Sequence, residues 1–346
     1  MARYKQPLDT NVLTAAKARL HHIFDLHDTV LVSFSGGKDS LAALHLTWEV
    51  AKERGHKQVN AVFYDEELLP DSVIDFIDHY RQLPWVNLRW FCIPLQSTKF
   101  ILGKATEYVQ WDPGRDHIRP MPAHAERLPP GDRRVFTQYT LNPYFCDAYK
   151  GKVAIITGIR ADESLFRLRA SLNKLNDSYI NATKTSKGSL CKPLYDWSEN
   201  DIFRYFYEQG ITYCPIYDAQ IWNRDSLRVS TPLHAESAKK FNRLRAADPV
   251  FYGRLIRLFP EMQVQERYWH ELDRKAIKRQ YGQSYDGIRA YILEQIPDEA
   301  QQAKALGALN RVIVRARKKP DCYPPAYVFT YIHNGAYKRE LLPKKV

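Results

Sequence analysis

The stretch SFSGGKDS, residues 33–40, restricts the fold more than any other part of the sequence. It follows an apolar run at residues 30–34, which is short and β-branched, as expected for a buried strand. It leads into residues 38–54, where apolar side chains recur near one face of a helix before Gly55 ends the pattern. A strand, a glycine turn and a helix in this order form the repeating unit of a parallel α/β sheet.

The same alternation continues along the chain. Strands are expected at residues 59–64, 86–93 and 152–158, and helices at 11–26, around 70–80 and at 198–210. We therefore predict an α/β fold with a Rossmann-like parallel sheet that is flanked by helices. In such sheets a ligand binds at the carboxyl ends of the strands, which is where the glycine turn lies.

The glycine turn has the chemistry of an anion site. Gly36 and Gly37 let backbone N–H groups approach a phosphate closely, while the helix N-terminus and Lys38 add positive charge. The pattern GxxxxGK[ST] is absent here, so this is no Walker A loop, and it is not GxGxxG either. We predict that Ser33, Ser35, Gly36, Gly37, Lys38 and Ser40 bind the phosphates of a nucleotide.

A second group of charged residues follows the expected strand at 152–158. The stretch GIRADES runs from Gly158 to Ser164, and Arg167 and Arg169 come shortly after it. Arginine forks bind phosphate or sulfate oxygens in a planar, bidentate way. Arginines at the start of a helix are also common surface ion-pair partners, so both interpretations stay open for these residues taken alone.

Four stretches resemble one family. SGGKDS resembles the PP-loop of the ATP-pyrophosphatase, or adenine nucleotide α-hydrolase, superfamily. GIRADES with Arg167 is similar to a signature of its phosphoadenosine-phosphosulfate (PAPS) reductase branch. KPLYDWS at 192–198 and ITYCPIYD at 211–218 resemble the end of that branch's nucleotide domain. The resemblance covers about residues 28–220, and the remainder resembles a PAPS-sulfotransferase-like subgroup that includes immunoglobulin-binding regulator A.

The resemblance implies a HUP-type fold that binds ATP or PAPS with Mg²⁺. It implies catalytic roles for Lys38, Asp39 and Arg160, with Asp39 as the Mg²⁺ ligand. It also implies that Asp65 lies near the ribose and adenine. Together with the residues of the glycine turn, the implied nucleotide contacts are Asp65, Gly158, Arg160, Glu163, Ser164 and Arg167.

The cysteines depart from the family pattern. The chain lacks the C-terminal ECGLH motif of PAPS reductases, and Cys146 alone lies where related enzymes have paired cysteines. One thiolate cannot hold a four-iron cluster, so no iron–sulfur cluster is expected. Cys146 is either a reactive thiol or a buried one, and Cys214 is expected to be structural.

Charge and composition suggest the domain organisation. We expect a leading helix in residues 1–26, the nucleotide domain in 27–232 with a long proline-rich insertion at about 103–143, and a basic helical region in 233–346. The insertion is either a lid on the substrate side or a disordered excursion. From residue 234 onward, 22 Lys and Arg face 12 Asp and Glu, while the whole chain carries +12.

The basic region is either an ordinary solvated helical surface or a platform for nucleic acid or another polyanion. On the second interpretation, cations would follow phosphates while Tyr281 and Tyr285 stack on bases. These cations are Lys275, Lys278, Arg279, Arg311, Arg315, Arg317, Lys318 and Lys319. A protein partner at this region is the other expectation.

Three functions fit these observations. The first is an enzyme that cleaves ATP, or PAPS, at the α-phosphate, adenylates an acceptor and releases pyrophosphate. The second is a PAPS reductase or sulfotransferase that acts on a sulfonucleotide, and the third is a non-catalytic nucleotide sensor that acts with a protein or DNA partner. We expect no membrane segment and a cytoplasmic location.

Overall fold

The structure is a computed structural model. It describes residues 8–102, 104–164, 167–168, 179–182, 187–222, 227–238, 241–268, 274–296, 298–338 and 340–344. The chain forms two compact units, residues 1–100 with 105–261 and residues 101–104 with 262–346. The division after residue 261 lies later than the predicted boundary at 232, because residues 233–261 pack with the first unit.

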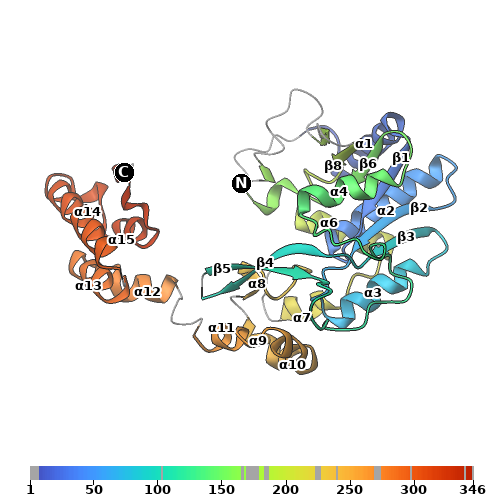
Figure 1. Ribbon diagram of the computed structural model, residues 1–346. Helices are drawn as coiled ribbons and strands as arrows, with labels where there is room; N and C mark the ends of the chain where they lie inside the picture. Colours follow the sequence, from blue (N-terminus) through green and yellow to red (C-terminus); the bar gives the residue numbers. More distant parts are fainter. Residues whose placement is uncertain are drawn as a thin grey trace. The chain divides into compact units, whose positions relative to one another are not determined.

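The first unit is built on a six-stranded sheet in the order β3-β2-β1-β6-β8-β7 (Figure 1). Five strands are parallel, and the edge strand β7 pairs antiparallel with β8. The strands are β1 (Thr29–Ser33), β2 (Val59–Tyr64), β3 (Val86–Phe91), β6 (Val153–Ile156), β7 (Ile180–Ala182) and β8 (Gly188–Cys191). The predicted α/β fold with a mostly parallel sheet is therefore confirmed.

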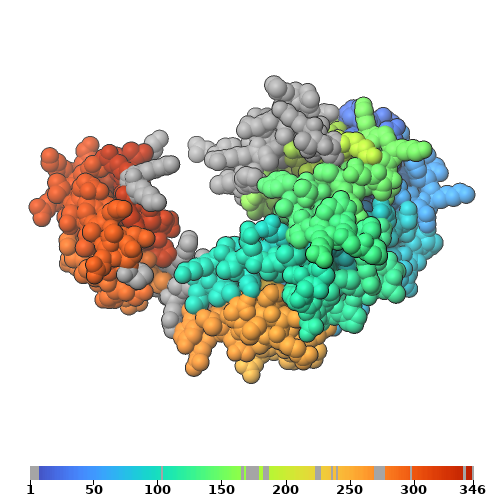
Figure 2. Space-filling view, in the orientation of Figure 1, coloured from blue at the N-terminus to red at the C-terminus, as the bar shows by residue number. Residues whose placement is uncertain are grey.

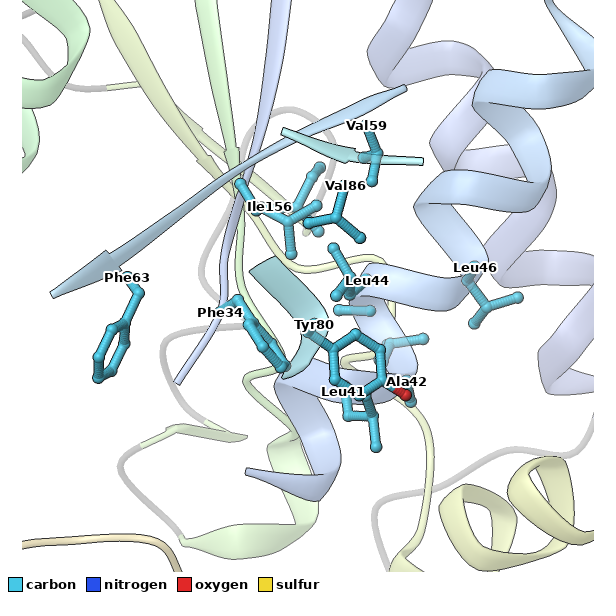
Figure 3. Packing of buried hydrophobic residues seen from close by; sticks show 14 of the residues in the cluster. Phe34, Leu41, Ala42, Leu44, Leu46, Val59, Phe63, Tyr80, Val86 and Ile156 are labelled. Carbon is cyan, nitrogen blue, oxygen red and sulfur yellow. The ribbon is translucent and has the colours of Figure 1, made fainter. Parts of the chain in front are cut away.

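Helices cover both faces of this sheet. Side chains alternate along β1, so that Val30 and Val32 pack on one face and Leu31 on the other. The first face is covered by α1 (Val12–Leu26), α2 (Lys38–Glu53), α3 (Asp71–Arg81) and α6 (Glu199–Gln209), and the second by α4 (Gln138–Asp147). Figure 3 shows Leu41 of α2 and Tyr80 of α3 close to Phe34, which follows β1. Burial on both faces explains why these strands are nearly continuous apolar runs.

Both ends of α6, which was predicted at residues 198–210, are capped. The Ser198 side chain accepts a hydrogen bond from the Asp201 N–H, and the Asp201 carboxylate accepts one from the Ser198 N–H at 2.7 Å. Gly210 ends the helix in the left-handed conformation, with φ of 62°.

The insertion is a packed part of the fold. It contributes β5 (Lys104–Gln110), which pairs with β4 (Leu95–Ile101) in a two-stranded sheet. Its side chains Trp111 and Ile118 are buried. Its surface can be followed in teal and green in Figure 2. The expectation of a disordered excursion is therefore wrong for residues 104–143, and a lid function remains a prediction.

Short helices complete the first unit. They are α7 (Ile216–Trp222), α8 (Ala235–Ala238), α9 (Phe241–Ala247) and α10 (Pro249–Leu258). Phe259, which follows α10, packs its ring against Tyr108 of β5 with 5.3 Å between the ring centroids. This contact with the insertion explains why residues beyond 232 belong to the first unit.

The second unit is helical. Its helices are α11 (Met262–Tyr268), α12 (Arg274–Tyr281), α13 (Tyr285–Gln295), α14 (Glu299–Lys318) and α15 (Pro325–His333). Helices α12 to α15 enclose a core of aliphatic and aromatic side chains that includes Ile288, Leu309 and Phe329. None of the described helices, in either unit, is long and apolar enough to cross a membrane.

Two tyrosines of the second unit do not have the predicted role. The Tyr281 ring is buried in the helical core, and its hydroxyl donates to Glu294 at 2.6 Å. The Tyr285 hydroxyl donates to the Tyr323 carbonyl at 2.5 Å. Tyr281 is thus part of the core of this unit and Tyr285 packs against that core, so neither ring lies fully open for the predicted stacking on nucleic-acid bases.

Candidate functional site

The candidate site lies where the order of the strands reverses. The chain runs from β1 to β2 and β3 on one side, and then crosses to β6 on the other side of β1. The carboxyl ends of β1 and β6 therefore bound a crevice at a topological switch point, the usual ligand position in open α/β sheets. The glycine loop (Ser35–Gly37) follows β1, and Thr157 and Gly158 follow β6.

The glycine loop has a conformation that requires its residue types. Gly36 has φ of +73°, and a Cβ atom there would lie 3.0 Å from Ile77 Cγ1. Gly37 is the N-cap of α2 and offers no side-chain cap. The Ser40 hydroxyl donates to the Gly37 carbonyl at 2.9 Å and accepts from the Ser35 N–H at 3.2 Å. This bracing presents the first turn of α2 to the crevice.

Lys38 brings a buried charge to the same place. Only 4% of its surface is exposed, and its Nζ atom donates to Asp39 at 3.0 Å and to the Leu227 carbonyl at 3.1 Å. Its backbone N–H donates to the Tyr217 hydroxyl at 2.8 Å. The Tyr217 oxygen accepts here, so its own proton can point to another acceptor. The N-terminus of α2 thus carries an ammonium group and a hydroxyl group side by side.

Arg160 and Gly158 connect β6 to this helix. The Arg160 Nε atom donates to Asp39 Oδ1 at 2.5 Å, and the arginine is 4% exposed. Gly158 lies against the first turn of α2, where a Cβ atom would come within 2.4 Å of the Asp39 carbonyl carbon. Glycine is thus required at 158 because the backbone after β6 packs directly against the backbone of α2. This requirement is separate from the predicted contact of Gly158 with a ligand.

The position of Asp39 bears on the predicted magnesium ligand. Its Oδ1 atom pairs with Arg160 and its Oδ2 atom pairs with Lys38. Two full positive charges beside one carboxylate disfavour a divalent cation at the same oxygens. Within the described residues, no group of three or more His, Cys, Asp or Glu side chains could hold a metal ion. The arrangement does not fit Asp39 as a magnesium ligand, so no step below is assigned to a metal.

A cavity of about 1100 Å³ opens beside these groups. Most of the predicted site residues line it, namely Ser33, Ser35, Gly37, Lys38, Asp39, Ser40, Gly158, Arg160, Glu163 and Arg167. Gly36 and Ser164 are not part of the lining. The Ser164 hydroxyl instead accepts from the Arg167 N–H at 3.2 Å, and Arg167 pairs with Glu163. Arg169 lies outside the described residues.

Asp65 is not a free carboxylate at the cavity. It is fully buried, and Arg119 donates to its Oδ1 atom at 2.5 Å while the Trp90 indole donates to Oδ2 at 3.0 Å. It is absent from the cavity lining, whereas its neighbour Glu66 is part of it. The structure therefore does not place Asp65, the predicted nucleotide contact, at the cavity. Burial, together with the nearby Asp65 charge, raises the pKa of Glu66 to about 7.

Sequence reasoning missed a second set of lining residues. Tyr217 lies in the PIYD stretch that resembles the family, but the prediction considered only Cys214 there. The segment 227–237, which begins with LRVS, supplies Leu227, Arg228, Val229, Ser230, His234 and Ser237. Burial lowers the pKa of His234, as does the charge of Arg228. No local sequence pattern identifies these residues. The contact of Lys38 with the Leu227 carbonyl, nearly 190 positions later in the chain, brings their loop to the cavity.

The cysteines lie away from this chemistry. Cys146, near the end of α4, is fully buried in the core, and the described lining of the cavity contains no cysteine. Burial raises the pKa of Cys191 to about 12 and also raises the pKa of Cys214. Thiols that are buried and protonated are poor nucleophiles. Cys146 thus has the surroundings of a structural thiol.

A family model agrees with this arrangement. The model, described as the phosphoadenosine phosphosulfate reductase domain, matches residues 29–254, from the first residue of β1 into α10. The chain belongs to this family. The PAPS reductase domain thus includes the 227–237 segment and extends beyond the predicted boundary at 232, in agreement with the compact first unit.

Individual proteins are similar to only part of this chain. The uncharacterized protein YbdN of Escherichia coli (strain K12) is 31% identical over 234 residues, which cover 63% of this chain and 57% of that protein. FMN adenylyltransferase of Candida glabrata, solved with FAD and inorganic pyrophosphate, is 15% identical over 60% of this chain and 58% of its own, with a TM-score of 0.40. The PAPS reductase of Candida auris is 14% identical over 63% and 90%, with a TM-score of 0.35. Likenesses this distant do not identify the reaction.

Proposed function

We propose that this PAPS reductase-family protein binds an adenine nucleotide in the cavity and transfers its adenylyl group to an acceptor. The observation that carries the proposal is the buried Lys38 at the N-terminus of α2, beside the glycine loop and within a cavity that is large enough for a nucleotide. Backbone N–H groups of the loop and the Lys38 ammonium would bind the β- and γ-phosphates of ATP.

The chemistry would be positioning and electrostatics. An acceptor oxygen attacks the α-phosphorus, and the bond from that phosphorus to the bridging oxygen breaks. Pyrophosphate leaves with the electron pair, and the acceptor loses its proton. Lys38 and the helix N-terminus would stabilise charge on the leaving pyrophosphate, and Arg160 would stabilise charge on the α-phosphate. Asp39 would hold both cations in place, since it contacts both.

The position of the thiols supports adenylyl transfer over thiol-dependent reduction. A reductase of the thiol type needs a nucleophilic cysteine beside the nucleotide, and none lies in the described lining. The proposal keeps the cytoplasmic location predicted from the sequence.

We also propose that the basic second unit contacts a polyanion that carries the acceptor. Four cations of α14 and the residue after it are exposed, namely Arg311, Arg317, Lys318 and Lys319. A row of exposed cations binds phosphates without base contacts. With Tyr281 buried and the half-buried Tyr285 packed against the helical core, this surface would bind mainly by charge, which suits a nucleic-acid backbone.

The test compares Lys38→Met with Lys52→Met. Methionine keeps most of the buried side-chain volume of Lys38, and Lys52 is an exposed lysine near the end of the same helix. Isothermal calorimetry with ATP should show that Lys38→Met weakens binding by on the order of 10- to 100-fold, because a charge-assisted hydrogen bond is lost. Lys52→Met should bind like the parent protein.

A second measurement tests turnover. Pyrophosphate release from ATP is followed with DNA, RNA or protein as the added acceptor, and the parent should release pyrophosphate with one of them. Equal ATP affinity in the two variants would refute the phosphate site. ATP binding without pyrophosphate release under any condition would leave a nucleotide sensor and remove the transferase.

A further inference from the structure

Side chains of the insertion bind the acidic turn (Asp65–Glu67) that follows β2. Glu67 is fully buried, and Arg115 donates to both of its carboxylate oxygens, at 2.7 and 2.5 Å. Arg119 pairs with Asp65 and also donates to the Glu67 carbonyl. The Trp111 N–H adds a bond to Glu67 at 2.6 Å. The first and third acids of the turn therefore contact the insertion.

The middle residue of the turn has different surroundings. Glu67 has φ of 61°, and its N–H donates to Asp65 Oδ1 at 2.9 Å, so the backbone reverses sharply there. Glu66 consequently lines the cavity, where its carboxylate accepts a hydrogen bond from the Thr231 N–H. No ion pair of Glu66 with an arginine or lysine is found among the described residues. It is a carboxylate without a compensating cation on a cavity wall.

The register of the sheet places Glu66 relative to the glycine loop. β2 lies parallel to β1, with Ser33 opposite Val62, so the carboxyl ends of the two strands are adjacent. Phosphates at the glycine loop would leave the sugar, one strand over, facing the end of β2. In dinucleotide-binding sheets of the Rossmann type, an acidic residue about 20 positions after the glycine turn binds a ribose hydroxyl, whereas a nearby arginine accommodates an added ribose phosphate.

We propose that Glu66 accepts hydrogen bonds from the ribose hydroxyls and thereby selects ATP over PAPS, whose ribose carries a 3′-phosphate. The inference rests on the proposed nucleotide site and names its substrate class. An ionised carboxylate attracts hydroxyl donors and repels a phosphate at the same distance. Arg115 and Arg119, which could have bound a 3′-phosphate, are instead engaged by Glu67 and Asp65. The insertion thus sets the specificity of a cavity through the turn that it holds.

The experiment measures dissociation constants for ATP, 3′-deoxy-ATP and PAPS by calorimetry at pH 8. The proteins are the parent, Glu66→Gln and Glu208→Gln, an exposed carboxylate on α6. The parent should bind ATP about 10-fold more tightly than 3′-deoxy-ATP, and more tightly still than PAPS. Glu66→Gln should shrink both ratios, the first to about 2-fold, because its amide is a weaker acceptor and repels no phosphate. Glu208→Gln should keep the parental ratios.

Several outcomes would overturn the proposal. PAPS that binds the parent more tightly than ATP would mean that Arg228 or another cation of the cavity receives the 3′-phosphate. Parental ratios in Glu66→Gln would exclude the ribose contact. A slower pyrophosphate release by this variant at unchanged affinities would place Glu66 at the acceptor instead. In each case a loss of ATP binding in Lys38→Met would still support the nucleotide site, so the two failures are distinguishable.

Discussion

Glu66→Gln is expected to stabilise the protein at alkaline pH while it impairs the proposed site. A carboxyl group whose pKa rises from 4.5 to about 7 favours its neutral form in the folded state. Above pH 7 it must ionise in that environment, which costs about 3 kcal/mol of unfolding free energy. Glu66 is only half-buried by exposed area, so solvent reduces this cost to about 2 kcal/mol. Glutamine keeps the acceptor for the Thr231 N–H and removes the charge.

The sign of the pH dependence follows from the raised pKa. Between pH 4.5 and 7 the folded state holds a proton that the unfolded state has released, so stability falls as pH rises through this window. The titratable groups that face Glu66 are Asp65, Tyr64 and Tyr108. Burial raises the pKa of both tyrosines above their ordinary value, so they stay neutral at pH 8. Asp65 forms an ion pair with Arg119.

The assay is urea unfolding at pH 5 and pH 8, followed by tryptophan fluorescence. Six of the seven tryptophans precede residue 262, so the signal reports mainly the first unit. At pH 8 the variant should be more stable than the parent by about 2 kcal/mol, and the gap should shrink markedly at pH 5. Glu208→Gln, with a surface pair, should change stability by less than about 1 kcal/mol at either pH. Equal pH profiles for the parent and Glu66→Gln would refute the claim that the cavity dehydrates this carboxylate.

Three other substitutions test separate parts of the structure. Gly158→Ala should lower the unfolding free energy by about 2 kcal/mol or more in a thermal melt, because the added Cβ would collide with the backbone of α2. Gly253→Ala in α10 is the control. Open space surrounds Gly253, so this substitution should be neutral or slightly stabilising in the same measurement. Tyr217→Phe removes the acceptor of the Lys38 N–H and should weaken ATP binding several-fold in calorimetry, at a cost of about 1 kcal/mol. Glutamate in place of the exposed cations at the end of α14 should weaken DNA or RNA binding, while ATP affinity stays unchanged. The slope of log K against log salt should fall by about one for each phosphate that is no longer neutralised. An unaltered salt slope would exclude this surface as the binding site. These cations are Arg317, Lys318 and Lys319.

The elements that carry local signals were predictable from the sequence. The strand at 59–64 has the predicted bounds, and the helix predicted at 198–210 has its caps at Ser198 and Gly210. Each depends on a short run of residues whose periodicity, cap or turn chemistry acts within the element itself. The glycine loop belongs to the same class, because Gly36 and Gly37 determine its backbone conformation.

Side-chain direction depends on distant partners, and it was not predictable. The sequence places Asp65 and Glu66 side by side after a strand, and the family resemblance implied a nucleotide contact at Asp65 alone. Arg119, 54 residues later, removes Asp65 from the cavity. The tyrosines at 281 and 285 failed as stacking residues for the same reason, since the packing of other helices decides whether an aromatic ring is exposed. The compact first unit continues past the predicted boundary at 232 to residue 261, and the contact between Phe259 and Tyr108 in that segment has no signal in composition.

The buried ion pairs of the insertion are best explained by the geometry that they impose. Burying Arg115 with Glu67 and Arg119 with Asp65 costs desolvation that roughly offsets the attraction, so well-packed apolar residues would stabilise the fold as much. A non-glycine residue in the left-handed conformation, as at Glu67, costs about 1 kcal/mol more. The two ion pairs therefore add little stability, but they fix one backbone reversal. The reversal determines the position of the residue that lies between the two paired acids. That residue is Glu66, and we infer that the insertion serves to hold its side chain at the cavity.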